Sequence, residues 1–334
     1  MKDKIFVFEH HETVNEWILK KIDLNKIFLK EININSKFIR RLGTLKIFIL
    51  IFYFHYFCSV NVMVSTIINS HLIKKIKFFF PKIKIISIQS YLMLKPELKK
   101  IDSLYHDKIL FFGPNQYQNY IQHNHKLLEF EFIGSLNYAI HRKKNIRELN
   151  PNIKIGYISQ WTPEMLKKVE TNNDQVKNIL DLEKNLKRYL SKFNLSYCVL
   201  MRSNKEDKEF NYLKKNFDKK NIFKRNSLFD NYKKLDQCQV IVSWCSTLAY
   251  EFFADNFKTV FFSNDKNDFL INSEINNIIG NDYYNFEKKI NYIMKLDSDI
   301  YKNLTFKIQN TIISKSDIYE TDNKIIKIIK KKIN

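Results

Sequence analysis

The stretch that most constrains the fold is LDQCQVIVSWCSTLAYEFFADNFKTVFFS, residues 235–263. Its pattern predicts a strand over 239–242, a polar turn over 243–247, a helix over 248–254 and a second strand over 259–262. A strand that passes through a polar turn into a helix, and from there into another strand, is the building unit of parallel α/β sheets. The chain is therefore expected to be an α/β protein.

The polar turn of this stretch places two hydroxyls, Ser246 and Thr247, at the mouth of the predicted helix. The unpaired N–H groups of a helix start and the helix dipole favour an anion there, typically a phosphate. Glu251 lies one turn further on the same face, where it would accept hydrogen bonds from a ribose diol. The same residue types also suit an ordinary N-cap followed by an acid. Both interpretations stay open on these residues alone.

Alternating strand and helix patterns extend over the whole chain. Further strands are expected at 5–8, 62–67, 84–88, 108–112, 129–133, 153–158, 197–201 and 221–223. Helices are expected at 14–22, 38–56, 71–80, 117–124, 175–193, 205–217, 227–235, 284–294, 301–314 and from 323 onward. The polar segment 137–152 lacks a strong period and marks the junction between domains over 1–148 and 149–334. This organisation predicts two Rossmann-like domains that face each other across a cleft.

Polar residues follow the predicted strands at their carboxyl ends, where open α/β sheets bind ligands. These residues are Glu9, Asn69, Gln89, Gly113, Ser135, Gln160, Arg202 and Ser246. The sequence contains neither GxGxxG nor GxxxxGK[ST], which argues against a dinucleotide fingerprint and a P-loop.

The net charge of +21 is compatible with nucleic acid, an anionic membrane surface or anionic small molecules as partners. The abundance of Lys, Ile, Asn and Phe is typical of AT-rich coding, and no nucleic-acid-binding motif is present, so no nucleic-acid partner is expected. The four cysteines and eight histidines show no ligand or disulfide spacing. We therefore expect no metal, and a reducing, cytoplasmic location.

One segment, residues 47–68, is a candidate membrane span. Its strongly apolar part, IFILIFYFHYFC, is only about 12 residues long, whereas a span needs about 20. The segment is expected to form a buried helix up to about Cys58 and then a buried strand over 62–67, with a membrane span as the alternative. The start of the chain, MKDKIFVFEHHE, has no signal-peptide pattern.

Several stretches resemble bacterial surface-carbohydrate biosynthesis proteins, which are distantly similar to CDP-glycerol glycerophosphotransferases and to Kdo and sialic acid transferases. The matching stretches, spread over about residues 60–300, are VMVSTIINS (62–70), FFPKIKIISIQS (79–90), ILFFGPNQY (109–117), FEFIGSLNY (130–138), IGYISQW (155–161), YCVLMRS (197–203) and QVIVSWCSTLAYEFFA (239–254). CSTLAYE is the most specific of them. The resemblance implies a GT-B architecture, with an N-terminal acceptor domain and a C-terminal donor domain for a nucleotide-sugar.

The resemblance also implies roles for individual residues. Ser246, Thr247 and Glu251 would hold the donor nucleotide, and Arg202 would meet its phosphates as a bidentate cation. Arg202 is equally compatible with a surface charge at a strand end. Gln160 and Trp161 would line the donor side, although a Trp there also suits packing. Asn69 and Gln89 would belong to the acceptor side.

Two departures from the family pattern stand out. The family usually has a glycine directly after the polar pair that ends its third strand, whereas here Gln89 is followed by Ser90 and Tyr91. A glycine allows close approach of a substrate, and Tyr91 would crowd that space. The family's STLGYE reads STLAYE here, which is a mild change.

The expected function is metal-independent glycosyl transfer from a nucleotide-sugar, used as substrate with no cofactor, to a surface polysaccharide or lipid-linked glycan. Glu9 and His10 are the candidate catalytic bases. Surplus lysines, including 327–332, would allow peripheral contact with an anionic inner membrane, although such a tail also suits a solvated helix. Two alternatives stay open: transfer of a polyol phosphate at the same anion site, and a non-catalytic nucleotide-binding relative.

Overall fold

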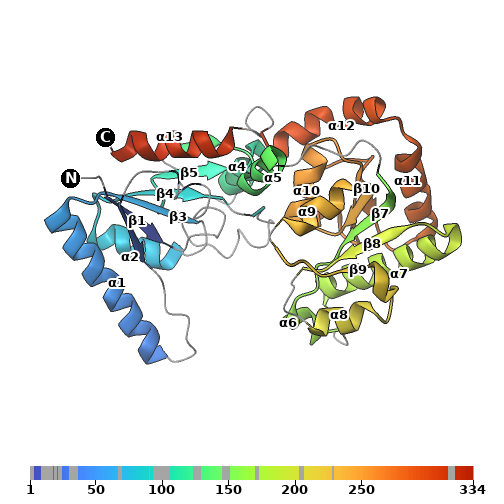
Figure 1. Ribbon diagram of the computed structural model, residues 1–334, viewed down its shortest axis with the longest axis horizontal. Helices are drawn as coiled ribbons and strands as arrows, with labels where there is room; N and C mark the ends of the chain where they lie inside the picture. The colour runs from blue at the N-terminus through green and yellow to red at the C-terminus, as the bar shows by residue number, and fades with distance from the viewer. Residues whose placement is uncertain are drawn as a thin grey trace. The chain divides into compact units, whose positions relative to one another are not determined.

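The computed structural model describes residues 4–8, 18, 21, 25–29, 37–66, 70–89, 91–92, 105–122, 129–144, 151–169, 173–202, 207–227, 229–314 and 320–333. The chain divides into two compact units (Figure 1). Unit 1 comprises Met1–Ile140 together with Ile313–Asn334, and unit 2 comprises His141–Ile312.

Unit 1 is built on a six-stranded parallel sheet in the order β2-β1-β3-β4-β5-β6. The strands are β1 (Lys4–Phe8), β2 (Asn25–Leu29), β3 (Val62–Thr66), β4 (Lys84–Ile88), β5 (Lys108–Phe111) and β6 (Glu129–Phe132). The helices are α1 (Lys37–Cys58), α2 (Ser70–Phe79), α4 (Pro114–Gln122), α5 (Leu136–Lys144), which runs on into unit 2, and α13 (Thr321–Ile333). The strand order reverses between β1 and β3, next to the middle of the sheet.

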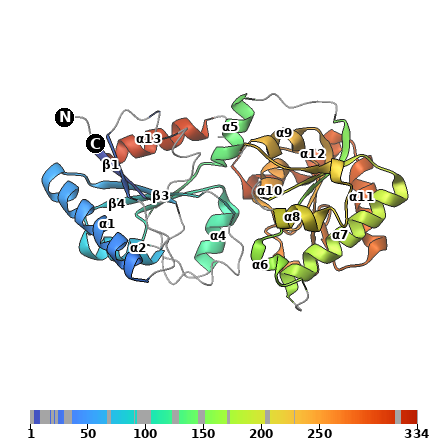
Figure 2. The same cartoon turned by 60° about the horizontal axis from the view of Figure 1, so that its bottom comes forward.

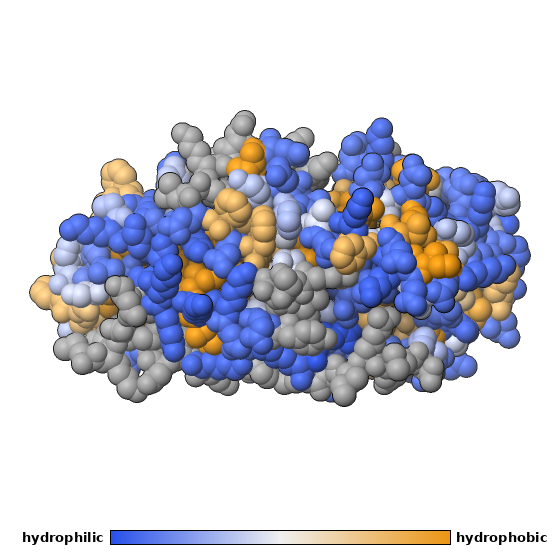
Figure 3. Space-filling model, turned by 90° about the horizontal axis from the view of Figure 1, so that it is seen from above, coloured by the Kyte–Doolittle hydropathy of each residue, from blue (hydrophilic) through white to orange (hydrophobic). Residues whose placement is uncertain are grey.

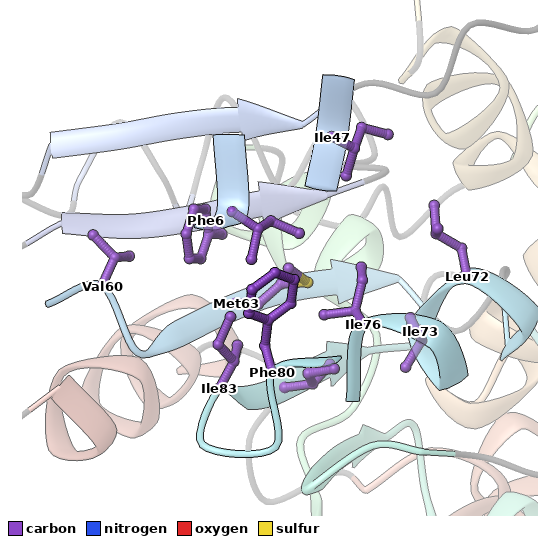
Figure 4. Packing of buried hydrophobic residues seen from close by; sticks show 11 residues of the cluster. Phe6, Ile47, Val60, Met63, Leu72, Ile73, Ile76, Phe80 and Ile83 are labelled. Atoms are coloured by element: carbon purple, nitrogen blue, oxygen red, sulfur yellow. The ribbon is translucent and has the colours of Figure 1, made fainter. Parts of the chain in front are cut away.

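The core of unit 1 forms where α1 and α2 cover the sheet. Its centre holds Met63 of β3, Ile76 of α2 and Phe80, whose side chains point toward one another (Figure 4). Ile47 and Ile51 of α1 join this cluster from one side of their helix and are at most 2% exposed. Their spacing of four residues puts them on the same helical face, and this face of α1 packs on the sheet.

Unit 2 is built on a second six-stranded parallel sheet, in the order β12-β11-β10-β7-β8-β9. The strands are β7 (Ile153–Ile158), β8 (Tyr197–Leu200), β9 (Ile222–Phe223), β10 (Cys238–Ser243), β11 (Thr259–Ser263) and β12 (Asn277–Ile279). Counted from β7, this is the strand order of the doubly wound dinucleotide-binding fold, and it reverses between β7 and β10. Both strands are buried on both faces, as their apolar sequences predict.

The helices of unit 2 are α6 (Pro163–Leu166), α7 (Asp174–Phe193), α8 (Asp207–Leu213), α9 (Asp230–Asp236), α10 (Thr247–Ala254), α11 (Tyr283–Lys295) and α12 (Ser298–Ile312). The clearest sequence signals belong to α7. Asn173 caps it by accepting hydrogen bonds from the N–H groups of Gln175 and Val176, and Asn194 ends it in the left-handed conformation with φ 46°.

The end of the chain departs from the expected organisation. The expected second domain ran from 149 to 334, but residues 313–334 pack with unit 1, and α13 lies with the elements of that unit in both ribbon views (Figures 1 and 2). Thr321 donates a hydrogen bond to the carbonyl of Ile133 at 2.8 Å, and Asp322 is paired with Lys21 at 2.6 Å. The α13 lysines partly face β6, because Lys332 lies 2.8 Å from Glu129. No local sequence pattern indicates that residues 313–334 pack with the N-terminal unit.

Residues 47–66 of the apolar segment form the last part of α1 and then β3, as expected, and residues 67 and 68 lie outside the described residues. Among the described residues, no helix has the length and apolar character that crossing a membrane requires. The expectation that this helix is buried is met on one face only, since several of its large side chains are exposed.

Candidate functional site

The candidate site lies in unit 2, at the carboxyl edge of the sheet where the strand order reverses between β7 and β10. At such a point the loops that follow the two strands diverge to opposite faces of the sheet, which opens a crevice where ligands of this fold class bind. Gln160 follows β7, and the turn Trp244–Ser246 follows β10 and leads into α10. The predicted donor residues Gln160, Ser246 and Thr247 are therefore brought to one edge.

Gln160 ties the loop after β7 to the turn after β10. Its Oε1 accepts a hydrogen bond from the backbone N–H of Cys245 at 2.7 Å, and its Nε2 lies 3.6 Å from Cys245 Sγ. The hydroxyl of Ser243 lies 3.4 Å from the same Oε1. Because the carboxamide is half-buried and engaged with the turn, Gln160 positions the backbone just before α10.

A second tie joins the loop after β7 to the loop after β8. The Glu209 carboxylate is fully buried, and its Oε1 accepts hydrogen bonds from the Ser159 hydroxyl at 2.6 Å and from the backbone N–H of Arg202 at 3.1 Å. The loops that follow β8, β7 and β10 thus form one continuous, braced edge. No sequence pattern indicates that Glu209 lies in this position.

Ser246 is the N-cap residue of α10, with extended backbone angles of φ −89° and ψ 131°. Its side chain accepts no capping hydrogen bond from the helix, so the ordinary N-cap interpretation does not describe its hydroxyl. The neighbouring Trp244 is 4% exposed, and its Nε1–H has no hydrogen-bond partner among the described residues. A buried donor without a partner costs about 1–3 kcal/mol, which an acceptor on a ligand would offset. The sequence had not singled out Trp244.

Arg202 is exposed at the end of β8, the strand beside β7. The pKa of the Glu164 carboxyl is lowered, first by the N–H of its own backbone and by the Thr162 hydroxyl, and also by the charges of Lys167 and Arg202. The backbone of Arg202 lies beside the loop that follows β7, because its N–H donates to the Glu209 oxygen that also accepts from the Ser159 hydroxyl. Its predicted contact with donor phosphates stays a prediction.

Glu251 lies one turn after Thr247 on α10, as predicted, but it is only 1% exposed. One of its oxygens accepts a hydrogen bond from the Tyr232 hydroxyl at 2.7 Å. Tyr232 is held in turn against the ring of His141, with 5.1 Å between ring centroids. The predicted contact of Glu251 with a ribose remains a prediction, and the structure adds the role of anchoring α10 to α9.

Trp161 is fully buried and belongs to the packing beneath this edge, the alternative left open above. Its Nε1–H donates to Glu183 Oε1 at 2.8 Å, and the Tyr157 hydroxyl donates to the same oxygen at 3.0 Å. Burial raises the pKa of Glu183 to about 7, against the lowering effect of these hydrogen bonds. The carboxyl therefore titrates near neutrality inside the unit.

The end of α5 carries a buried cluster of charges in the segment that was expected to be a polar junction. His141 Nε2 lies 2.7 Å from Asp236 Oδ2, and Arg142 Nη1 forms an ion pair with Asp236 Oδ1 at 2.8 Å. Arg142 also contacts Asp255 at 3.0 Å, just beyond the end of α10. The cluster fixes α5 to α9 and to the end of α10, and the candidate site lies at the start of α10.

Of the four predicted site residues in unit 1, the structure describes only Gln89. Glu9, His10 and Asn69 lie outside the described residues. Gln89 is 2% exposed, and its Oε1 accepts from the N–H of Phe112 at 2.8 Å. Its Nε2 donates to Gln116 and to the Tyr91 carbonyl, so the carboxamide braces the loops after β4 and β5.

Among the described residues of both units, no three His, Cys, Asp or Glu side chains gather as a metal-binding group.

Comparisons with known proteins agree with this architecture. The model of a family described as "putative O-antigen biosynthesis protein" matches residues 95–276, more than half of the chain. A search of curated proteins finds no match.

Solved structures match over nearly the whole chain. The Methanocaldococcus jannaschii UDP-GlcNAc 2-epimerase, in complex with UDP-GlcNAc and UDP, has a TM-score of 0.63 at 12% identity, covering 99% of this chain and 100% of the epimerase. The wall teichoic acid polymerase TagF has a TM-score of 0.56 at 10% identity, covering 99% of this chain and 89% of TagF. Sucrose-phosphate synthase from Thermosynechococcus elongatus has a TM-score of 0.55 at 10% identity, covering 99% and 100%. The expected GT-B fold of two Rossmann-like domains is confirmed.

Proposed function

The chain belongs to the O-antigen biosynthesis protein family identified by that match, and from this premise we propose that it is a glycosyltransferase that uses a nucleotide-sugar donor. The acceptor would be a surface polysaccharide or a lipid-linked glycan. The observation that carries the proposal is the braced edge of unit 2: Gln160 holds the turn before α10, and the Ser246 hydroxyl at the helix start is not used as a cap.

Donor binding would use groups that favour phosphate oxygens. The first turn of α10 directs N–H groups and the positive end of its dipole toward the edge. The hydroxyls of Ser246 and Thr247 lie at that helix start, and the exposed guanidinium of Arg202 follows the strand next to β7. A phosphate at this point would gain charge-assisted hydrogen bonds without a metal ion.

Catalysis would then be mainly electrostatic. The acceptor hydroxyl loses its proton to a base and attacks the anomeric carbon, the bond from that carbon to the phosphate oxygen breaks, and the nucleotide leaves with the bonding electrons. The groups at the start of α10, together with Arg202, would stabilise the negative charge that grows on the leaving phosphate. Glu9 and His10, which follow β1, are retained as candidate bases. Asn69 and Gln89 are retained for the acceptor side, with unit 1 as the acceptor domain.

The likeness to solved structures supports two further reactions at the same edge. The epimerase likeness favours inversion at carbon 2 of a nucleotide-sugar, and the TagF likeness favours transfer of a polyol phosphate. All three reactions begin with a nucleotide diphosphate bound at the same place, and they differ in their products.

The proposal is tested by titrating the full chain with UDP-GlcNAc, other nucleotide-sugars and CDP-glycerol, with melting temperature and calorimetry as readouts. Binding to the folded state raises the melting temperature. Ser246→Ala with Thr247→Ala is expected to weaken binding by about tenfold or more, because two hydrogen bonds to a charged phosphate are lost. Ser298→Ala at the start of α12 is the matched control and is expected to change nothing.

The products identify the reaction. Transfer of a sugar releases the nucleotide and adds the sugar mass to the acceptor, whereas epimerisation leaves the donor mass unchanged and alters its chromatographic position. CDP-glycerol as the sole productive donor would favour polyol-phosphate transfer. Binding that is unchanged in the double variant would refute the assignment of the donor site, and the absence of binding to every nucleotide would favour a non-catalytic relative.

A further inference from the structure

Helix α1 carries large apolar side chains on the face that points away from the core. Ile47 and Ile51 are buried, whereas Ile49, Phe52, Tyr53, Tyr56 and Phe57 are exposed by 52–70%. Phe78 of α2 is 79% exposed. We call these six exposed residues the aromatic face. Its rings contact one another, since the centroids of Phe52 and Tyr56 lie 4.9 Å apart and those of Tyr53 and Phe57 5.6 Å apart.

The two helices present these side chains on adjoining surfaces. Phe48 of α1 packs edge-on against Phe79 at 5.5 Å, and Phe79 packs edge-on against Phe78 at 5.1 Å. Both ribbon views draw α1 and α2 side by side (Figures 1 and 2). On the face of the molecule seen in Figure 3 hydrophilic residues predominate and hydrophobic ones come in small groups. Large exposed apolar side chains that gather on neighbouring helices mark an interaction site.

The segment that carries the aromatic face is strongly basic, although the carboxylate of Asp107 pairs with Lys77 and lies 4.0 Å from Lys84. Between Glu31 and Glu97 the sequence has ten Lys or Arg residues and no Asp or Glu. This segment contains α1, β3, α2 and β4. Exposed lysines in it are Lys46, Lys74, Lys75, Lys82 and Lys84. The surface therefore combines large aromatic side chains with an unbalanced positive charge.

We propose that the aromatic face of α1 and α2 docks unit 1 onto an anionic lipid bilayer. Phe and Tyr side chains would enter the interfacial region, and the flanking lysines would attract anionic headgroups. The helix would lie on the membrane, consistent with the absence of a helix long and apolar enough to span it among the described residues. This surface is distinct from the lysine-rich α13, whose Lys324 and Lys332 lie within 4 Å of β6 carboxylates.

Two features favour a bilayer over a protein partner. A symmetric contact between two copies would place the same positively charged surface against itself, which costs free energy through repulsion between like charges. Protein interfaces are also depleted in lysine and enriched in arginine, whereas eight of the ten cationic residues between Glu31 and Glu97 are lysines. An anionic bilayer offers an interfacial region for the aromatic side chains and negatively charged headgroups for the lysines.

The test is co-sedimentation of the full chain with vesicles of phosphatidylcholine alone or mixed with phosphatidylglycerol. Wild-type protein is expected to bind the mixed vesicles, more weakly as salt rises. Phe57→Gln with Phe78→Gln is expected to weaken binding by about tenfold or more, because two side chains lose their interfacial contact. Lys75→Glu with Lys82→Glu is expected to weaken binding to mixed vesicles by about tenfold or more and to leave binding to neutral vesicles nearly unchanged.

Matched controls come from unit 2: Tyr284→Gln, which removes an aromatic side chain that is 70% exposed, and Lys302→Glu with Lys307→Glu on α12. All replaced side chains are exposed, so unchanged melting temperatures are expected. Failure of the wild type to bind mixed vesicles overturns the proposal, as does equal binding by the aromatic-face variant.

A wild-type dimer that the aromatic-face variant dissociates, measured by ultracentrifugation, would assign the face to a second copy instead. Binding to polyglutamate without vesicle binding would assign it to an acidic protein. Neither result depends on nucleotide binding, so this inference and the proposed function can fail separately.

Discussion

The two units each use a buried or half-buried glutamine at the carboxyl edge of a parallel sheet, and the two sites differ in what surrounds it. In unit 1, both the oxygen and the nitrogen of the Gln89 carboxamide form hydrogen bonds within the protein. The partners are the N–H of Phe112, the side chain of Gln116 and the carbonyl of Tyr91. In unit 2, Gln160 holds only the turn before α10. That turn also carries the Ser246 hydroxyl, which does not cap the helix, and the Trp244 N–H, which has no partner among the described residues.

This difference shows that a polar residue at a strand end does not by itself make a ligand site. The Gln89 carboxamide joins the loops after β4 and β5. The Gln160 carboxamide holds the turn before α10, next to hydrogen-bond donors that a ligand could use. The buried polar groups of the two units also differ. Unit 1 buries Asp322 and Asp107, each paired with a lysine, whereas unit 2 buries Asp236 with His141 and Arg142, and Glu183 with the neutral donors Trp161 and Tyr157. Because burial raises the pKa of Glu183 to about 7, we expect the stability of unit 2 to respond to pH near neutrality.

The largest expected effect is that of Asp236→Ala. The substitution leaves His141 and Arg142 buried without their shared carboxylate, and it should lower the free energy of unfolding of unit 2 by about 3–5 kcal/mol. Urea unfolding, followed by probes in each unit, measures it. Asp255→Asn, which removes a more exposed partner of Arg142, should cost clearly less. Equal effects on both units, or none, would contradict the assignment of this cluster to unit 2.

The next effect is the pH dependence contributed by Glu183. Its pKa is raised by burial from 4.5 to about 7, so between these values the folded state binds a proton that the unfolded state releases. The contribution of Glu183 to stability is therefore greatest below about pH 4.5 and falls by about 3 kcal/mol as pH rises to about 7. Glu183→Gln should remove this part of the pH dependence and be the more stable protein at pH 8. Parallel pH profiles of the two proteins, measured by urea unfolding, would show that Glu183 is not the source.

A smaller effect is expected at Gly156 in the middle of β7. A Cβ built there would lie 2.7 Å from Cys238 Sγ and 3.0 Å from Leu235 Cδ2. Gly156→Ala should cost about 1–3 kcal/mol, because β10 and α9 must shift to admit the methyl group. Combining it with Cys238→Ala should recover part of the loss. The absence of any recovery in unfolding measurements would show that the crowding comes from elsewhere.

Elements with a strong local pattern could be predicted from the sequence. Runs of Val and Ile predicted β7 and β10, and the amphipathic period predicted α7. The expectation that polar residues follow β7 and β10 at one edge holds for Gln160 and Ser246, because parallel strands align their carboxyl ends.

What escaped prediction depends on pairs that lie far apart in the sequence. The segment around His141 looked like a polar junction, but its charge partner Asp236 is 95 residues away. The tail from Thr321 returns to Ile133 across 188 residues, and Trp161 turned out to be a donor to Glu183. The strand β2, NKIFL, was not expected, and it takes its place in the sheet by pairing in parallel with β1. No local period reports on contacts of this kind.

The smallest effect compares the two glutamines directly. Gln89→Ala and Gln160→Ala each leave a backbone N–H without its acceptor, and each should lower the free energy of unfolding by about 1–2 kcal/mol. Only Gln160→Ala should also weaken nucleotide binding, by about tenfold, since the turn before α10 loses its brace. Calorimetry with the nucleotide that binds the wild type measures both variants. If Gln89→Ala weakens binding as much as Gln160→Ala does, the loss follows stability alone, and the distinction between the two sheet edges fails.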